Sequence, residues 1–205
     1  MIPERASDPE GLLSKARAGE GDALGSLLEL YRRYLTLLAR LQIHQRLQTK
    51  ADASDLVQET FAEAHRDFGR FRGASEAELT QWLRTILARR VAKLVRRYYG
   101  AQSRDVRLEM RLGEDLDRSS SALGRGLSEP QTSPSQKMIQ RENAVLLADA
   151  LESLPEHYRD VLVLRHLEGR SFDEVARRLD RSVDSVKHLW SRALGQLRRR
   201  LGEKR

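Results

Sequence analysis

The sequence predicts an all-α fold of two small helical domains joined by a flexible linker, with a helix-turn-helix in the C-terminal domain. Apolar residues recur at helical spacing along most of the chain, and no segment shows the alternation typical of a β-strand. Between the two helical regions the composition shifts to Ser, Gly, Pro and Gln, which is typical of a linker. A chain of 205 residues with 40% hydrophobic residues can build two small cores. We therefore expect domains at residues 10–100 and 138–205 and the linker at 101–137.

Charge and composition limit the classes of function. The chain has 37 basic and 30 acidic residues, and the resulting net charge of +7 favours a polyanionic partner without naming it. The absence of Cys excludes a disulfide framework and a thiolate zinc site, and the five His show no paired spacing, so we expect no metal and no cofactor. The first thirty residues contain no unbroken apolar run, which predicts neither a secretory signal nor a membrane span. We expect a cytoplasmic protein.

The first domain begins with a long amphipathic helix expected from Asp22 to about Leu41. A polar connection is expected at 44–53, and Ser54 is a plausible N-cap for the next helix. On that helix the carboxylates of Asp55, Glu59 and Glu63 fall four residues apart, away from the apolar positions. The pattern predicts an exposed acidic stripe.

A loop at 71–75 separates this helix from a longer one at about 76–99, because Gly73 lies among small polar residues. Trp82 falls on the apolar face of the longer helix, which favours core packing over a contact with DNA. The stretch from Arg84 to Arg104, with both ends counted, contains seven cations and no carboxylate. This basic charge is therefore local, as expected of a surface that faces a polyanion.

The linker allows a weak helix at about 104–117, where Val106, Met110 and Leu112 form a small apolar strip. Two helices are expected after it, at 138–153 and at 156–167, with Leu154-Pro155 between them. Gly169 is expected to end the second of these as a C-cap.

The segment from Ser171 to Leu201 predicts the helix-turn-helix. Ser171 and Glu174 form a capping box at the start of its first helix. A turn follows at 180–182, where Asp180 replaces the usual glycine and tolerates a left-handed backbone. The second helix leaves polar side chains outward near its start, where they can reach base edges in a major groove. The alternative is an ordinary pair of amphipathic helices with a solvated charged face.

Several motifs, taken in order, resemble one family. They are the segment Asp55-Leu56-Val57-Gln58-Glu59-Thr60-Phe61, then Phe71-Arg72-Gly73, Trp82-Leu83-Arg84-Thr85-Ile86, Leu154-Pro155, Ser171-Phe172-Asp173-Glu174-Val175-Ala176 and Val186-Lys187. This ordered set resembles bacterial sigma-70-type initiation factors, most closely the two-domain extracytoplasmic function (ECF) class. The resemblance covers roughly residues 22–100 and 140–201.

The resemblance implies a promoter-specificity subunit and not an enzyme. In this family the first domain binds the polymerase clamp helices and opens and reads the −10 promoter element, and the second domain reads the −35 element. Its partners would be core RNA polymerase, promoter DNA and an anti-sigma factor of the kind that commonly inhibits members of the family. The resemblance also places the loop from Phe71 to Glu76 beside a base extruded from the non-template strand.

The resemblance assigns residues to three surfaces. The polymerase-binding residues are Asp55, Gln58 and Glu59. The residues expected to bind DNA at the −10 element are Arg72, Arg89, Arg90, Lys93, Arg96 and Arg97. Those expected at the −35 element are Arg181, Ser185, Lys187, His188 and Arg192.

Two other classes of function remain open from the residues themselves. A stand-alone helix-turn-helix transcriptional regulator would use only the second domain, but a sensor domain has no need for the acidic stripe followed by the basic helix. A nuclease or recombinase would need Mg²⁺, which Asp52, Asp55 and Glu59 could hold in principle. A row of carboxylates on one helix is more often a solvated face.

Overall fold

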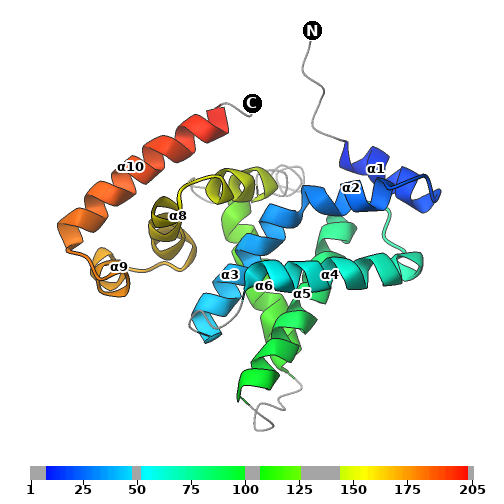
Figure 1. Cartoon of the computed structure of the whole chain (residues 1–205), viewed down its shortest axis with the longest axis horizontal. Helices are drawn as coiled ribbons and strands as arrows, with labels where there is room; N and C mark the ends of the chain where they lie inside the picture. Colours follow the sequence, from blue (N-terminus) through cyan, green and yellow to red (C-terminus); the bar gives the residue numbers. More distant parts are fainter. Residues whose placement is uncertain (1–7, 48–51, 100–106, 126–143, 203–205) are drawn as a thin grey trace. The chain divides into compact units, whose positions relative to one another are not determined.

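The computed structural model describes residues 8–47, 52–99, 107–125 and 144–202, and every regular element among them is a helix (Figure 1). This confirms the all-α prediction. The chain divides into two compact units, Met1–Asp117 and Arg118–Arg205, and each is described by itself. None of the described helices is both long and apolar enough to cross a membrane.

The first unit is built around three helices that pack on one another, α3, α4 and α5. Together with α1 and α2, its elements are α1 (Pro9–Arg17), α2 (Ala23–Leu30), α3 (Arg32–Leu47), α4 (Ala53–Asp67), the short 3₁₀ helix η1 (Phe68–Arg70) and α5 (Glu76–Tyr99). The core is aliphatic with two tyrosines, and its fully buried side chains include Leu27, Tyr31, Tyr34, Leu35, Leu38, Leu41, Leu79, Leu83, Ile86 and Leu87. α1 packs on α2 (Figure 1).

The single long helix expected from Asp22 is wrong, because the chain breaks at Tyr31 into α2 and α3. The Tyr31 amide donates to the Leu28 carbonyl at 3.0 Å, and α3 then restarts with the Leu35 amide bonded to the Tyr31 carbonyl at 2.9 Å. The buried Tyr31 hydroxyl donates to Glu76 Oε1 at 2.9 Å, which ties the break to the start of α5. The apolar spacing continues through the break, so the pattern alone could not reveal it.

The start of α4 also differs from the prediction. Asp52 is the N-cap, and its carboxylate accepts a hydrogen bond from the Ser54 amide at 2.8 Å. Ser54 therefore lies inside the first turn. α3 continues to Leu47, into the stretch expected to be a polar connection, and residues 48–51 lie outside the described part of the chain.

α5 has the predicted bounds, and the weak helix expected at about 104–117 is present but begins at Leu108 and runs on to Arg125. This stretch forms α6 (Leu108–Arg125). Leu108, Leu112 and Leu116 are buried at successive turns of α6, whereas Met110, expected on the apolar strip, is 60% exposed. Val106 lies outside the described residues.

Two ion pairs hold the first part of α6 to α5. Arg84 Nε lies 2.7 Å from Asp117 Oδ1, and Arg96 Nη1 lies 2.9 Å from Glu109 Oε1. Since the earlier residue of α5 pairs with the later residue of α6, the two helices run antiparallel. The domain limits at residues 100 and 138 stay predictions.

The second unit contains helical residues 144–152, α8 (Glu156–Leu162), a π-helical turn η3 (Val163–Leu167), α9 (Phe172–Leu179) and α10 (Val183–Gly202). α10 packs on both α8 and α9 (Figure 1, orange to red). Its core comes from Val161, Leu162, Val175, Val186, Ala193 and Leu197. Pro155 precedes α8 as its N-cap, and Gly169 has the positive φ of 69° expected of a helix end. The expected start of the preceding helix, residues 138–143, lies outside the described residues.

Candidate polymerase and nucleic-acid interfaces

One face of α4 carries exposed polar side chains. Asp55, Gln58 and Glu59 are exposed, while Leu56 and Val57 between them are buried. The Asp55 and Glu59 carboxylates lie one helical turn apart, as the spacing predicts. These three residues form a surface that is called the α4 face below.

The acidic stripe does not extend to Glu63, which corrects the sequence-based expectation. Glu63 is 8% exposed and lies between two arginines of α5. Its Oε1 forms an ion pair with Arg89 Nη2 at 3.2 Å, and its Oε2 accepts a hydrogen bond from Arg90. The Arg90 guanidinium also reaches Glu59 Oε2 at 3.4 Å. Charges expected on two separate surfaces thus neutralise one another where α4 packs on α5.

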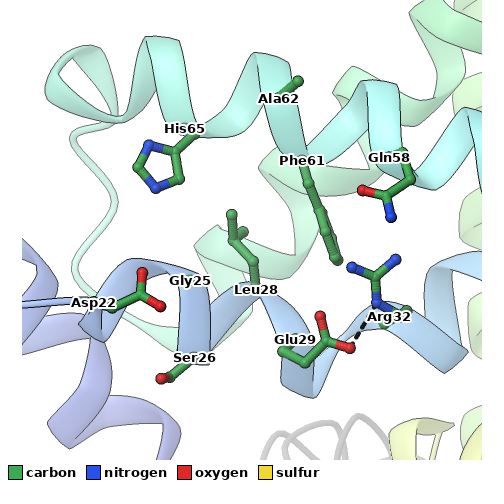
Figure 2. Close-up of a pocket in the computed structure, with 10 residues that line it drawn as sticks. All are labelled: Asp22, Gly25, Ser26, Leu28, Glu29, Arg32, Gln58, Phe61, Ala62 and His65. Atoms are coloured by element: carbon green, nitrogen blue, oxygen red, sulfur yellow. Dashed lines mark hydrogen bonds and ion pairs between the residues drawn. The ribbon is translucent and has the colours of Figure 1, made fainter.

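A groove of about 580 Å³ adjoins the α4 face on the side of α2. Figure 2 shows Asp22, Ser26 and Glu29 along one edge and Gln58, Ala62 and His65 along the other. At one end, Arg32 lies over the Phe61 ring at 4.9 Å and pairs with Glu29 at 2.6 Å. The groove shows that Gln58 borders a concave surface rather than a flat helix face.

The cations of α5 differ in how far they are available to a partner. Arg84 is buried and donates to the Tyr34 hydroxyl at 3.1 Å as well as to Asp117. Arg90 also forms a largely buried ion pair with Glu63, and 18% of its side chain is exposed. Lys93 and Arg97, in contrast, are exposed and form no ion pair among the described residues. The basic run is therefore only partly a surface feature, and Arg104 lies outside the described residues.

The loop at 71–75 is tightly held. The Ala74 and Ser75 amides donate to Glu78 Oε2 at 2.7 and 3.1 Å, and the Ser75 hydroxyl donates to the same oxygen at 2.9 Å. These bonds, that of the Ala74 amide above all, lower the pKa of the Glu78 carboxyl. Glu78 and Ser75 form a capping box at the start of α5 that the sequence reading missed, although its spacing is the same as that of Ser171 and Glu174.

Aromatic residues pack beside this loop. The Phe71 ring stacks on Trp82 with centroids 4.9 Å apart, and Phe68 lies 6.0 Å from Phe71. Trp82 is half-buried in this cluster and packs on Phe71 and Phe68, while the choice between a packing role and a DNA contact stays a prediction. Tyr98, near the end of α5, is 47% exposed. Arg72 points away from the core and donates to the Gly69 carbonyl at 3.4 Å.

The helix-turn-helix has the geometry that its sequence predicts. Ser171 and Glu174 form the capping box, with the Ser171 amide 2.8 Å from Glu174 Oε2. Asp180 adopts the left-handed conformation, with φ 50° and ψ 53°. Ser182 caps α10 by accepting from the Ser185 amide at 3.2 Å.

The outward side of α10 is rich in donors. Arg181 in the turn is exposed, as are Lys187, His188 and Arg192, while Ser185 is half-buried. Lys187 lies 4.0 Å from Asp184, at the limit of an ion pair. The structure therefore brings the predicted −35 residues together along the start of one helix.

A second cluster behind α10 was missed by the sequence reading. The Trp190 indole N–H donates to His166 Nε2 at 2.9 Å, and Phe172 packs edge-on against the Trp190 ring at 5.5 Å. Burial, with the nearby Arg165 charge, lowers the pKa of His166, which is the direction this hydrogen bond favours because Nε2 can accept only without a proton. No local signal links His166 to Trp190, which is 24 residues later.

Two of the three carboxylates of the Mg²⁺ hypothesis, Asp52 and Glu59, have other partners. Asp52 accepts from the Ser54 amide and Glu59 pairs with Arg90. Within the described residues, no three acidic or His side chains are grouped as a metal would need.

Fold and surfaces together define a helix-turn-helix protein with a second helical unit that carries its own polar face. Residues 30–100 match the family described as "Sigma-70 region 2", and residues 144–197 match "Sigma-70, region 4". The chain is 33% identical over 190 residues to the "ECF RNA polymerase sigma factor BldN" of Streptomyces coelicolor. That alignment covers 93% of this chain and 64% of the relative.

Two further relatives are ECF RNA polymerase sigma-E factors. The one from Haemophilus influenzae is 28% identical over 186 residues, covering 91% of this chain and 90% of the relative. The one from Escherichia coli K12 is 28% identical over 176 residues, covering 86% and 85%. The chain belongs to the ECF class of the sigma-70 family, whose members are promoter-recognition subunits of RNA polymerase and not enzymes.

Proposed function

We propose that promoter recognition by this sigma factor divides among three surfaces. The α4 face binds core RNA polymerase, the exposed cations of α5 with the loop at 71–75 bind the −10 element, and the start of α10 binds the −35 element. The observation that carries the proposal is the exposure of Asp55, Gln58 and Glu59 on one face of α4. On α5, Lys93 and Arg97 are also exposed and form no ion pair among the described residues. A cytoplasmic location follows from this role.

The α4 face suits a basic partner. Exposed carboxylates contribute to orientation and association rate more than to affinity, because water screens them strongly. Asp55 has no ion pair among the described residues, whereas Glu59 shares its charge with Arg90. Asp55 is therefore the residue on which polymerase binding should depend most.

Among the residues assigned to the −10 element, three cations have the strongest support for a contact with DNA. Arg72, Lys93 and Arg97 are exposed and can each neutralise a phosphate with release of counterions. Arg89 and Arg96 would exchange a carboxylate partner, Glu63 or Glu109, for a phosphate. Arg90 is the least available of the residues assigned to this element, because it is held by Glu63 inside the α4–α5 contact.

The −35 surface combines phosphate and base contacts. Lys187 and Arg192 lie on the exposed side of α10, and Arg or Lys at such positions can donate to the O6 and N7 atoms of guanine. His188 adds a donor on the same side of the helix, and Arg181 lies in the turn before it. The side chains of the preceding helix α9 would brace the protein on the DNA backbone.

One experiment tests the proposed function as a whole. Purified protein is added to core RNA polymerase and genomic DNA fragments, and the 5′ ends of the transcripts are mapped. Start sites that appear only with the protein and share two short upstream motifs are expected. Transcription that is independent of the protein contradicts the proposal.

The polymerase contact has its own test. We expect Asp55→Arg to abolish core binding, measured by co-elution, while binding of duplex DNA by the second unit is unchanged. Glu20→Arg reverses an exposed charge elsewhere in the same unit and serves as the control. Equal loss of polymerase and DNA binding in Asp55→Arg counts against the assignment of the α4 face. An anti-sigma partner stays a prediction of the family resemblance.

A further inference from the structure

The loop at 71–75 is shaped by contacts from α5. Beyond the hydrogen bonds to Glu78, the loop has no room for a side chain at Gly73: a Cβ there would lie 2.6 Å from Glu78 Cβ and against the Phe71 ring. Phe71 is itself stacked on Trp82. The loop backbone is therefore specified by close packing and not only by its turn.

Arg17, in the last turn of α1, holds the loop from the opposite side. Its Nη2 donates to the Gly73 carbonyl, across 56 residues of sequence. Its guanidinium carbon also lies 5.8 Å from the centre of the Phe71 ring, a cation–π distance. Its positive charge also contributes, less than the hydrogen bonds from Ala74 and Ser75, to the lowered pKa of Glu78.

α1 is a stable platform for this contact. It is capped by Asp8, packs on α2, and buries Leu13. A cavity of about 460 Å³ lies between α1 and the loop, and its lining is formed by Ala16, Arg17, Phe68, Gly69, Phe71 and Arg72. Arg17 and Arg72 thus line one cavity, so displacing the first side chain changes the surroundings of the second.

We infer that Arg17 is a positioning residue for promoter opening: by holding the Gly73 carbonyl and the Phe71 ring, it presets the loop and Arg72 to receive the separated non-template strand. The inference rests on the proposed function, which places this loop beside an extruded base. It extends that function to α1, which lies before the matched sigma-70 region 2 at residues 30–100. Presetting matters because a loop that is ordered before binding loses less conformational freedom when DNA arrives.

The test uses holoenzyme reconstituted from the full-length protein and the promoter found by transcript mapping. Open complex is followed by 2-aminopurine fluorescence in the −10 segment of duplex promoter. Base preference is measured on pre-opened fragments that differ in one unpaired non-template base. The variants are Arg17→Ala, Arg17→Lys and Gly73→Ala. Lys15→Ala removes an exposed cation from the same helix as the matched control.

Arg17→Ala is expected to lower open-complex formation about tenfold, as for loss of one charged hydrogen bond, and to flatten the base preference on pre-opened DNA. Lys can donate to one carbonyl but lacks the planar fork, so Arg17→Lys should lie between the wild type and Arg17→Ala. Gly73→Ala should flatten the preference in the same way. The double variant Arg17→Ala with Gly73→Ala should then be little worse than either single change, because both act on one loop.

Polymerase binding should be unchanged in Arg17→Ala, and the thermal unfolding midpoint should fall by only a few degrees, since the exposed side chain gives up one hydrogen bond to the loop. The inference is overturned if Arg17→Ala behaves like Lys15→Ala. It is also overturned if Arg17→Ala weakens binding of every base equally, adds fully to Gly73→Ala and is restored by Lys, because Arg17 would then contact a phosphate directly. Failure of the wild type to give specific starts would instead refute the proposed function, and the inference with it.

Discussion

α5 and α10 are both long basic helices, but they use their cations differently. In α5, Arg84, Arg89, Arg90 and Arg96 pair with carboxylates of α4 or α6. In α10, Arg192, Arg198 and Arg199 are exposed and form no ion pair among the described residues. The difference arises because α5 lies between two helices that bring Glu63, Glu109 and Asp117 to it. The number of cations in a segment therefore overstates the charge that DNA can meet.

The comparison separates two roles of arginine. A buried guanidinium bound to a carboxylate contributes to a specific packing arrangement, and its loss leaves the partner charge desolvated. An exposed guanidinium contributes little to stability and remains available to phosphate or guanine. Substitutions that affect one property and not the other test the comparison directly.

The largest effect is expected for Arg90→Met. The side chain of Glu63 is 10% exposed, and without Arg90 it keeps only the ion pair with Arg89. We therefore expect the free energy of unfolding to fall by about 3 kcal/mol. Urea denaturation followed by circular dichroism measures this. Lys93→Met on the exposed side of the same helix is the control and should change stability by no more than about 0.5 kcal/mol. Similar losses in both variants would show that Arg90 is not a structural residue.

A somewhat smaller effect, on binding instead of folding, is expected for α10. Replacing Lys187 and Arg192 together with Ala should weaken promoter binding by about 2 kcal/mol and leave core association unchanged. Competition with unlabelled promoter fragments measures the loss, and Lys15→Ala controls for overall charge. A double variant that binds the promoter as well as the wild type would remove these residues from the −35 surface.

Removing the exposed cations of α5 should chiefly change how strongly promoter binding depends on salt concentration. Lys93→Ala with Arg97→Ala should reduce the slope of log binding constant against log salt by about 1.5, because each phosphate contact contributes roughly 0.7 to 0.9. Titrations of holoenzyme with promoter at several salt concentrations give the slope. An unchanged slope would mean that the free cations of α5 face something other than DNA.

The smallest effect is expected for the two capping boxes, one in each unit, whose loss should lower stability slightly. Ser75→Ala and Ser171→Ala should each destabilise by about 1 kcal/mol, the usual contribution of an N-cap. Hydrogen bonds from the Ala74 and Ser171 amides lower the pKa values of Glu78 and Glu174, respectively. Their stabilisation is therefore complete above the unfolded pKa of about 4.3 and is lost as the pH falls through the lowered folded values.

Glu78→Gln and Glu174→Gln should remove this part of the acid sensitivity, which denaturation curves at neutral and acidic pH can measure. A variant that keeps the full acid sensitivity of the wild type would show that its carboxylate does not carry the effect.

Features encoded by neighbouring residues were predictable from the sequence. Ser171 with Glu174, the left-handed Asp180 and the bounds of α5 depend on residues a few positions apart, and the structure confirms them. Apolar spacing also located most of the core. The exposure of Asp55, Gln58 and Glu59 agrees with the pattern, while their roles stay predictions.

Features that depend on remote partners were not predictable. Glu63 follows the same helical spacing as Asp55, but it is buried where it meets Arg89 and Arg90 of α5, 26 and 27 residues later. α6 was underestimated because its carboxylates complement arginines on α5, as when Asp117 meets Arg84 across 33 residues. The sequence lists the charged residues, but the folded structure determines which of them form ion pairs with one another.

Helix α6 also changes the distance over which this molecule can stretch. Its 18 residues rise about 27 Å as a helix, where the same residues fully extended would cover about 60 Å. We therefore expect residues 108–125 to contribute less reach between the proposed −10 and −35 surfaces than a flexible segment of the same length would. A shorter reach restricts the spacing between the two promoter elements that one molecule can bind at the same time. We therefore expect poor recognition of promoters whose two elements lie a few base pairs too far apart.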